Sequence, residues 1–194
     1  TMLNATGNNC IFNMGSAGRN DGVAVFFQAT TITIWIEGNT HTFSFTASAN
    51  TWYWVQVIRA SGVIRCYVDG VQKGSDTNDN VSISIASSAG YTIGKVDTYN
   101  YYFNGWMKEL RVSKNARVVG IPSTQFSTDS NTLLLMHFDT PATSPLGPAI
   151  AFDGTGDYLD FSDSADFAPG TGAFTVEGFF NTGVPATAQT IYDT

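Results

Sequence analysis

The residues best suited to chemistry are carboxylates near the end of the chain. Asp153 and Asp157 frame the stretch Asp-Gly-Thr-Gly-Asp, further aspartates follow, and Asp139 lies shortly before it. Carboxylate and carbonyl oxygens on turns are the ligands that Ca²⁺ prefers. Asp and Gly also make tight turns by themselves, because Asp side chains accept backbone hydrogen bonds. Two interpretations follow: a structural calcium site at Asp139, Asp153 and Asp157, or a simple turn.

A second candidate site is a loop rich in tyrosine and asparagine. Aromatic rings stack on the apolar faces of sugar rings, and amide groups hydrogen-bond to sugar hydroxyls. Trp35 and Tyr53 are further aromatic residues that could face solvent on their strands. The alternative is that all these rings pack against a neighbouring domain. The predicted ligand-binding residues are Tyr99, Asn100, Tyr101, Tyr102 and Asn104.

Antiparallel β-strands must position these loops. Apolar-rich runs flank Ser61-Gly62, and a second turn follows at Asp69-Gly70, as in two-residue hairpins. Between them apolar and polar residues alternate, so that Cys66 faces the core, as a free thiol or, alternatively, in a disulfide with Cys10. No useful window shows helical spacing. The fold class is therefore all-β, a two-sheet antiparallel β-sandwich of the jelly-roll type.

Composition excludes several classes of function. The chain has 194 residues, of which 43% are hydrophobic and 13% are charged, and its formal net charge is -7. An acidic protein repels phosphate groups, so neither nucleic acid nor an anionic membrane is an expected partner. No apolar run approaches the ~20 residues of a membrane span, and the first residues lack the basic and apolar pattern of a signal peptide.

Three segments carry a family resemblance. They are Ala149 to Val176, the hairpin pair W-Y-W-V-Q-V-I-R-A-S-G-V-I-R-C-Y-V-D-G-V, and Y-T-I-G followed by Y-F-N-G-W-M-K-E-L-R-V-S. Together they resemble the concanavalin A-like lectin/glucanase superfamily, in particular its laminin-G-like, pentraxin-type jelly rolls. This resemblance implies the sandwich fold, and it implies that a structural Ca²⁺ at the rim is possible.

The order of the segments indicates a tandem array. The segment that resembles the opening of such a domain lies last, and Cys10-Ile11-Phe12-Asn13 is similar to Thr190-Ile191-Tyr192-Asp193. We therefore predict that residues 1–127 are the later strands of one repeat and that residues 128–148 are a linker and joining strand. Residues 149–194 are then the first strands of the next repeat, or, alternatively, the permuted start of the same domain.

Catalysis is not expected. The related glucanases carry a Glu-x-Asp-x-x-Glu pattern, whereas Glu37, Glu109 and Glu177 are far apart and none has Asp two residues later. Glycoside hydrolysis needs two carboxylates about 5–10 Å apart. His41 and His137 lack metal-ligand spacing and are predicted to be hydrogen-bonded strand residues.

The functional expectation comes from the resemblance. Tandem domains with segments like Leu133 to Asp139 resemble those of phage tail fibres. They imply a non-catalytic structural and carbohydrate-binding module of a virion fibre or tail protein, which contacts host-surface glycans beside neighbouring copies, with a trimer as one expected arrangement. The alternative is a domain of a secreted bacterial adhesin or a carbohydrate-binding accessory module of an extracellular enzyme. The expected location is the virion or the extracellular space.

Overall fold

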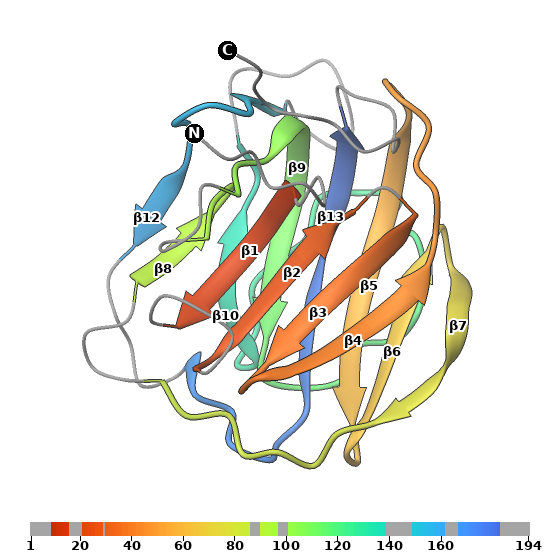
Figure 1. Ribbon diagram of the computed structural model, residues 1–194, viewed down its shortest axis with the longest axis vertical. Coiled ribbons are helices and arrows are strands. Elements are labelled where there is room, and N and C mark those ends of the chain that lie inside the picture. The colour runs from red at the N-terminus through yellow and green to blue at the C-terminus, as the bar shows by residue number, and fades with distance from the viewer. Residues whose placement is uncertain are drawn as a thin grey trace.

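The computed structural model describes residues 9–15, 21–28, 30–85, 90–96, 101–138, 149–161 and 167–182. In these ranges the chain forms two antiparallel sheets that lie face to face (Figure 1), which confirms the predicted all-β sandwich. None of the described residues belongs to a helix long and apolar enough to cross a membrane.

The first sheet has six strands in the order β12-β8-β1-β2-β3-β4. Four of them follow one another along the chain, whereas β8 and β12 join from later positions. The strands are β1 (Asn9–Gly15), β2 (Val23–Phe27), β3 (Thr31–Ile36), β4 (Asn39–Ser44), β8 (Gly90–Ile93) and β12 (Leu159–Phe161).

The second sheet has seven strands, in the order β10-β9-β13-β5-β6-β7, with β11 paired to β9. The predicted hairpin turns are confirmed: Ser61 and Gly62 have φ values of 50° and 70°, and Asp69 and Gly70 have 52° and 77°. The strands are β5 (Trp52–Ala60), β6 (Val63–Val68), β7 (Val71–Asn78), β9 (Asn104–Ser113), β10 (Thr132–Met136), β11 (Ile150–Asp153) and β13 (Phe174–Thr182).

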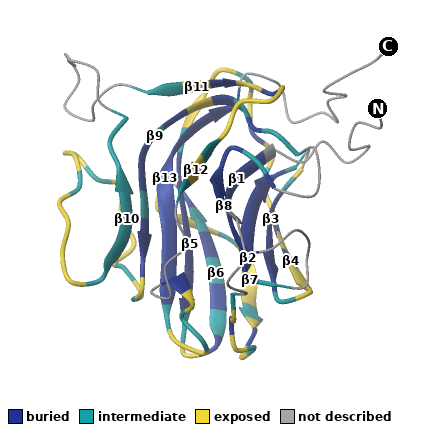
Figure 2. Ribbon diagram, turned by 90° about the vertical axis from the view of Figure 1, so that its left-hand side faces the viewer, coloured by how far each residue is buried: buried dark blue, intermediate teal, exposed yellow. Residues whose placement is uncertain are grey.

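The main core lies between the two sheets, where the inward residues of the strands are buried (Figure 2). A smaller cluster lies on the opposite face of the six-stranded sheet and contains Cys10, Phe26 and Trp35. Cys66 is a buried free thiol in the main core, as predicted, and Cys10 is also free, so the two do not form a disulfide. Burial raises the pKa of Cys66 to about 12.

The segment from residue 149 onward contributes to both sheets. Strand β13 lies between β5 and β9 and is buried along its whole length, while β12 extends the six-stranded sheet. In this structure β11, β12 and β13 thus pair with strands from earlier in the chain. The assignment of residues 1–127, 128–148 and 149–194 to successive repeats stays a prediction.

Candidate functional site

The tyrosine- and asparagine-rich loop is described only in part. Tyr99 and Asn100 lie outside the described residues, and the side chain of Tyr102 is half-buried. The ring of Tyr101 packs edge-on against Phe26 and Trp35, with 6.1 Å between centroids in each pair. Trp35 is only 5% exposed, so the expectation that it could face solvent is wrong: Tyr101 and Phe26 cover it. Tyr53 is also not free, because its ring packs 5.0 Å from Phe45.

The aspartate-rich stretch forms a turn that connects the two sheets. Asp153 Oδ1 accepts a hydrogen bond from Thr155 N at 2.6 Å, and Asp157 Oδ2 accepts one from Asp153 N at 3.1 Å. Gly154 and Gly156 adopt φ values of 85° and 86°. Asp139 lies outside the described residues, and no group of three metal-ligating side chains occurs within them. The contacts are those of the turn interpretation, and calcium stays a prediction.

Replacing Asp153 tests both interpretations. Asp153→Ala is expected to lower the free energy of unfolding by about 1 kcal/mol, because Thr155 N loses its acceptor. Asp153→Asn keeps an acceptor oxygen and should cost less. Thermal unfolding in excess Ca²⁺ and in chelator is the measurement. A bound calcium would raise the melting temperature of the wild type and not that of either variant, whereas equal values in both conditions would contradict the calcium site.

One predicted sugar ligand and one predicted metal ligand lie side by side. Asn104, at the start of β9, pairs across the sheet with Asp153, at the end of β11. The side chain of Asn104 also lies against Gly154, where an added Cβ would come within 2.9 Å of its Nδ2 atom. Both residues lie at the same end of the seven-stranded sheet, on the face that points away from the six-stranded sheet. We call this face the outer face.

A β-bulge decides which residues of β9 reach the outer face. The register between β13 and β9 shifts between Glu177 and Phe179, and Glu109 has φ = 52°. The extra residue on β9 reverses the alternation of its side chains. Trp106 and Lys108 therefore point outward before the bulge, and Arg111 points outward after it, while Met107, Leu110 and Val112 enter the core.

The open half of the outer face carries a row of two tryptophans with an asparagine between them. Asn181 of β13 pairs with Trp52 of β5 on one side and with Trp106 of β9 on the other. Strands are ~4.8 Å apart, so the two tryptophan backbones are roughly 10 Å apart. Trp52 is 37% and Trp106 is 47% exposed. Asn181 is only 8% exposed, and its Oδ1 atom is buried without a hydrogen-bond partner among the residues that the structure describes. We call these three residues the tryptophan row.

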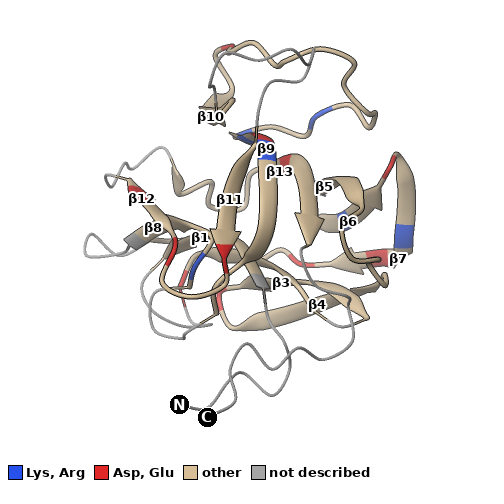
Figure 3. Ribbon diagram, turned by 90° about the horizontal axis from the view of Figure 1, so that it is seen from above, with Lys and Arg blue, Asp and Glu red and all other residues tan. Residues whose placement is uncertain are grey.

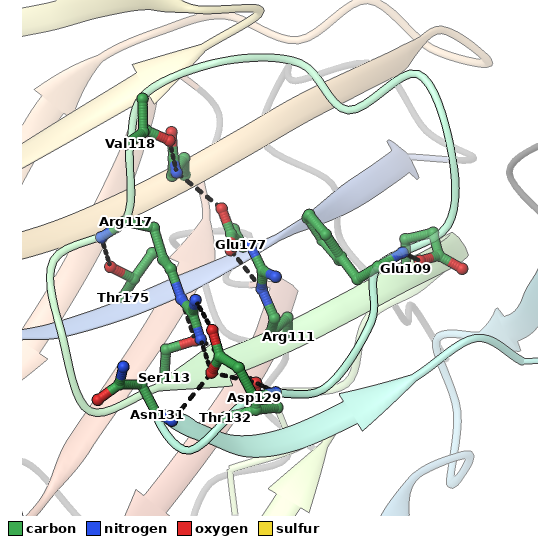
Figure 4. Close-up of polar contacts among 12 residues, drawn as sticks. Glu109, Arg111, Ser113, Arg117, Val118, Asp129, Asn131, Thr132, Thr175 and Glu177 are labelled. Atoms are coloured by element: carbon green, nitrogen blue, oxygen red, sulfur yellow. Dashed lines mark hydrogen bonds and ion pairs between the residues drawn. The ribbon is translucent and has the colours of Figure 1, made fainter.

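The other half of the outer face is polar and covered. Arg111 Nε donates to Glu177 Oε1 at 2.7 Å, and Gln56 Nε2 donates to Glu177 Oε2 at 2.7 Å and to Val118 O at 3.1 Å (Figure 4). Burial raises the pKa of Glu177, although Arg111 and Gln56 act in the opposite direction. Glu177 is only 2% exposed, and its partner in the ion pair is Arg111.

The cover is the segment of residues 114–131, which we call the strap. It lies on the side of the seven-stranded sheet opposite the six-stranded sheet (Figure 2). Phe126 N donates to Glu109 Oε2 at 2.9 Å, and the Phe126 ring lies 3.5 Å from the Arg111 guanidinium. Arg117 N donates to Thr175 Oγ1 of β13 at 3.0 Å.

An internal ion pair shapes the strap. The guanidinium of Arg117 donates to both carboxylate oxygens of Asp129, and its Nε donates to Ser113 Oγ at 2.9 Å. The hydrogen bond from Arg117 holds the pKa of Asp129 far below its usual range. The strap is thus joined both to itself and to the sheet beneath it (Figure 4).

The family comparison agrees with this architecture. A family profile described as "Concanavalin A-like lectin/glucanases superfamily" matches residues 2–119. The chain belongs to this superfamily. Neither a curated protein nor a solved structure matches the chain. A concanavalin A-like domain has a carbohydrate-binding type of fold, so the resemblance seen in the sequence is confirmed, whereas it leaves the position of a binding site open.

The glutamates of this concanavalin A-like domain all have structural contacts. Glu109 is fully buried and accepts hydrogen bonds from His137 Nδ1 at 2.8 Å and Phe126 N at 2.9 Å. Glu37 accepts hydrogen bonds from Gly22 N and Ser84 N. His41 lies 2.6 Å from Asp79, so both histidines have the hydrogen-bond partners predicted for them, although His137 lies just beyond the end of β10.

Sequence reasoning missed the tryptophan row of this concanavalin A-like domain. Trp52 and Trp106 stand in segments that were recognised, but more than 50 residues separate them in the chain. The signal in the sequence was the presence of tryptophan at strand positions that alternate with core residues. Asn181 gave no such signal, because only the register of β13 places it between the two rings.

Proposed function

We propose that this domain is a non-catalytic carbohydrate-binding module that stacks sugar rings on the tryptophan row. The observation that carries the proposal is the pair of exposed rings on either side of Asn181, whose buried Oδ1 has no partner in the described structure. Aromatic rings bind the apolar faces of sugars, and the two exposed rings lie on the same face of the sheet. The spacing of roughly 10 Å spans about two pyranose units.

The position of the carboxylates supports binding without hydrolysis. Glu109 and Glu177 do lie on adjacent strands, yet both are buried beneath the strap and each is held by a cation or a histidine. A glycosidase needs its acid and its base at the scissile bond. The proposed role is therefore recognition, and a test for released reducing ends with any bound glycan is expected to be negative.

Removing the row tests the proposed function. A glycan array with the intact chain, with and without Ca²⁺, is expected to show binding, and Trp52→Ala and Trp106→Ala are each expected to weaken it about tenfold. Tyr158→Ala is the matched control, because Tyr158 is an exposed aromatic residue outside the row. Tyr102→Ala tests whether the tyrosine- and asparagine-rich loop, predicted from the sequence to bind sugar, contributes to the affinity. Binding that survives both tryptophan variants would contradict this site, and a folded chain that binds no glycan would contradict the function.

We further propose that the module belongs to a virion fibre or tail protein that contacts host-surface glycans, with neighbouring copies as its other partners. The support is the similarity of the two chain ends, which favours an array of domains. In Figure 3 the Lys and Arg segments are few and lie apart, which favours glycan over nucleic acid. A secreted adhesin or an enzyme accessory module is the alternative. A trimer of the full protein would favour the fibre, and a catalytic domain in the same protein would favour the alternative.

A further inference from the structure

Lys108 places an ammonium group beside the tryptophan row. It lies two residues after Trp106 on the same face of β9, and it pairs across the sheet with Phe179 of β13. Its Nζ atom lies 4.6 Å from the centroid of Trp52 and 5.4 Å from that of Phe179. The side chain therefore crosses β13 next to Asn181, and its charge borders the surface on which we propose that sugars stack.

This ammonium group has no counterion in the described structure. Arg65, Arg111 and Arg117 on the same sheet and strap are each paired with a carboxylate, at 2.5 Å. By contrast, no carboxylate of the described residues lies within 4.0 Å of Lys108 Nζ. Burial also lowers the pKa of Lys108, with the charge of Glu109 acting the other way. A partly desolvated cation without a carboxylate partner gains free energy when a ligand supplies an anion.

We propose that the tryptophan row binds an acidic pyranose, with the sugar's carboxylate or sulfate at Lys108 Nζ. This inference rests on the proposed function, because it specifies the class of sugar at the same site. The positions of Lys108 and Asp153 also determine the expected orientation of the ligand. Asp153 lies at the far end of the outer face, beside Asn104, and its charge repels an anion. The anionic group therefore points toward Phe179, and neutral hydroxyls point toward Asn104 and Asp153.

Because the chain as a whole is negatively charged, the attraction of an acidic sugar must come from its direct contact with Lys108. A formal net charge of -7 opposes a long polyanion, but fields are screened within about 8 Å at physiological ionic strength. Contact between one ammonium group and one anionic group is consistent with the negative net charge and with the short range of the screened field. The affinity for an acidic sugar should accordingly fall only weakly with added salt, as expected for one ion pair.

Matched acidic and neutral glycans test the proposal. The probes are 3′-sialyllactose with lactose, an oligogalacturonate with its methyl ester, and sulfated with unsulfated lactose. The intact chain is expected to bind the acidic member of at least one pair about tenfold more tightly, the size of a charge-assisted hydrogen bond. The three pairs also distinguish a carboxylate from a sulfate as the preferred group.

Variants of Lys108 connect the preference to this residue. Lys108→Gln should abolish the preference, so that the acidic and the neutral member of each pair bind with equal affinity, while Lys108→Arg should retain it. Lys73→Gln is the control, because Lys73 also lies over an aromatic ring, Phe45, but on β7. Equal binding of both members, or a preference that persists in Lys108→Gln, would overturn the inference and leave the proposed function standing. A folded chain that binds none of these probes nor any glycan on the array would overturn both.

Discussion

Replacing Phe180 with alanine is expected to lower the free energy of unfolding by about 3–5 kcal/mol and the melting temperature by about 10 °C. Phe180 of β13 is 1% exposed, and its ring packs against Phe27 of the opposite sheet at 5.9 Å and against Phe103 at 6.3 Å. Truncation would leave a cavity between the sheets. Chemical and thermal denaturation of the whole chain, followed by circular dichroism, is the measurement.

This variant also tests how the chain is divided. If β13 belongs to the same cooperative unit as β2, the single unfolding transition shifts as a whole. A double-mutant cycle with Phe27→Leu and Phe180→Leu should then give a coupling free energy of about 0.5–1.5 kcal/mol, as is typical of edge-to-face rings. An unchanged main transition in Phe180→Ala would instead mean that residues 149–194 fold apart from the earlier strands.

Replacing Arg59 with methionine is expected to lower the free energy of unfolding by about 2–4 kcal/mol. Arg59 is fully buried and donates hydrogen bonds to the carbonyl oxygens of Val81, Gly170 and Gly172. It thus connects β5 to the segment that leads into β13. Methionine fills a similar volume but leaves these oxygens with fewer donors in a buried place.

The matched control is Arg65→Met on the neighbouring strand β6. Arg65 forms an ion pair with Asp76 that is largely exposed, so its loss should lower the stability much less than the loss of Arg59. Denaturant titrations of both variants, compared by their midpoints at equal slope, measure the difference. Similar stabilities for the two variants would mean that the contacts of Arg59 do not stabilise the fold.

The strap and the tryptophan row divide the outer face into two regions with different roles. Under the strap, Arg111 Nε and Gln56 Nε2 donate to Glu177, and Gln56 Nε2 also donates to Val118 O, while Gln56 Oε1 is buried without a partner among the described residues. Beyond the strap, Asn181 Oδ1 is likewise buried without a partner among the described residues, but the rings of Trp52 and Trp106 on either side of it are exposed. The division therefore follows from exposure, because Gln56 and Glu177 are covered under the strap, whereas two aromatic rings beyond it face solvent and suit a ligand.

Local patterns determined much of the fold from the sequence alone. The hairpins at Ser61-Gly62 and Asp69-Gly70 depend on residues that accept positive φ, and the inward direction of Cys66 depends on a period of two. The turn at Asp153 to Asp157 is equally local, since Asp side chains hydrogen-bond within it. These features involve neighbours along the chain, and their chemistry is visible without the tertiary structure.

The tertiary structure alone decided how the site is assembled. The alternation of β9 gave no clear polar face, because a bulge at Glu109 reverses its sides and so sends both Trp106 and Arg111 outward. The register of β13 brings Asn181 between Trp52 and Trp106. The ring of Tyr101 packs edge-on against Trp35, far from it in the chain, and its role in sugar binding stays a prediction. The pairing of strands that are more than 50 residues apart depends on how the two whole sheets pack together. No local sequence pattern predicts this packing.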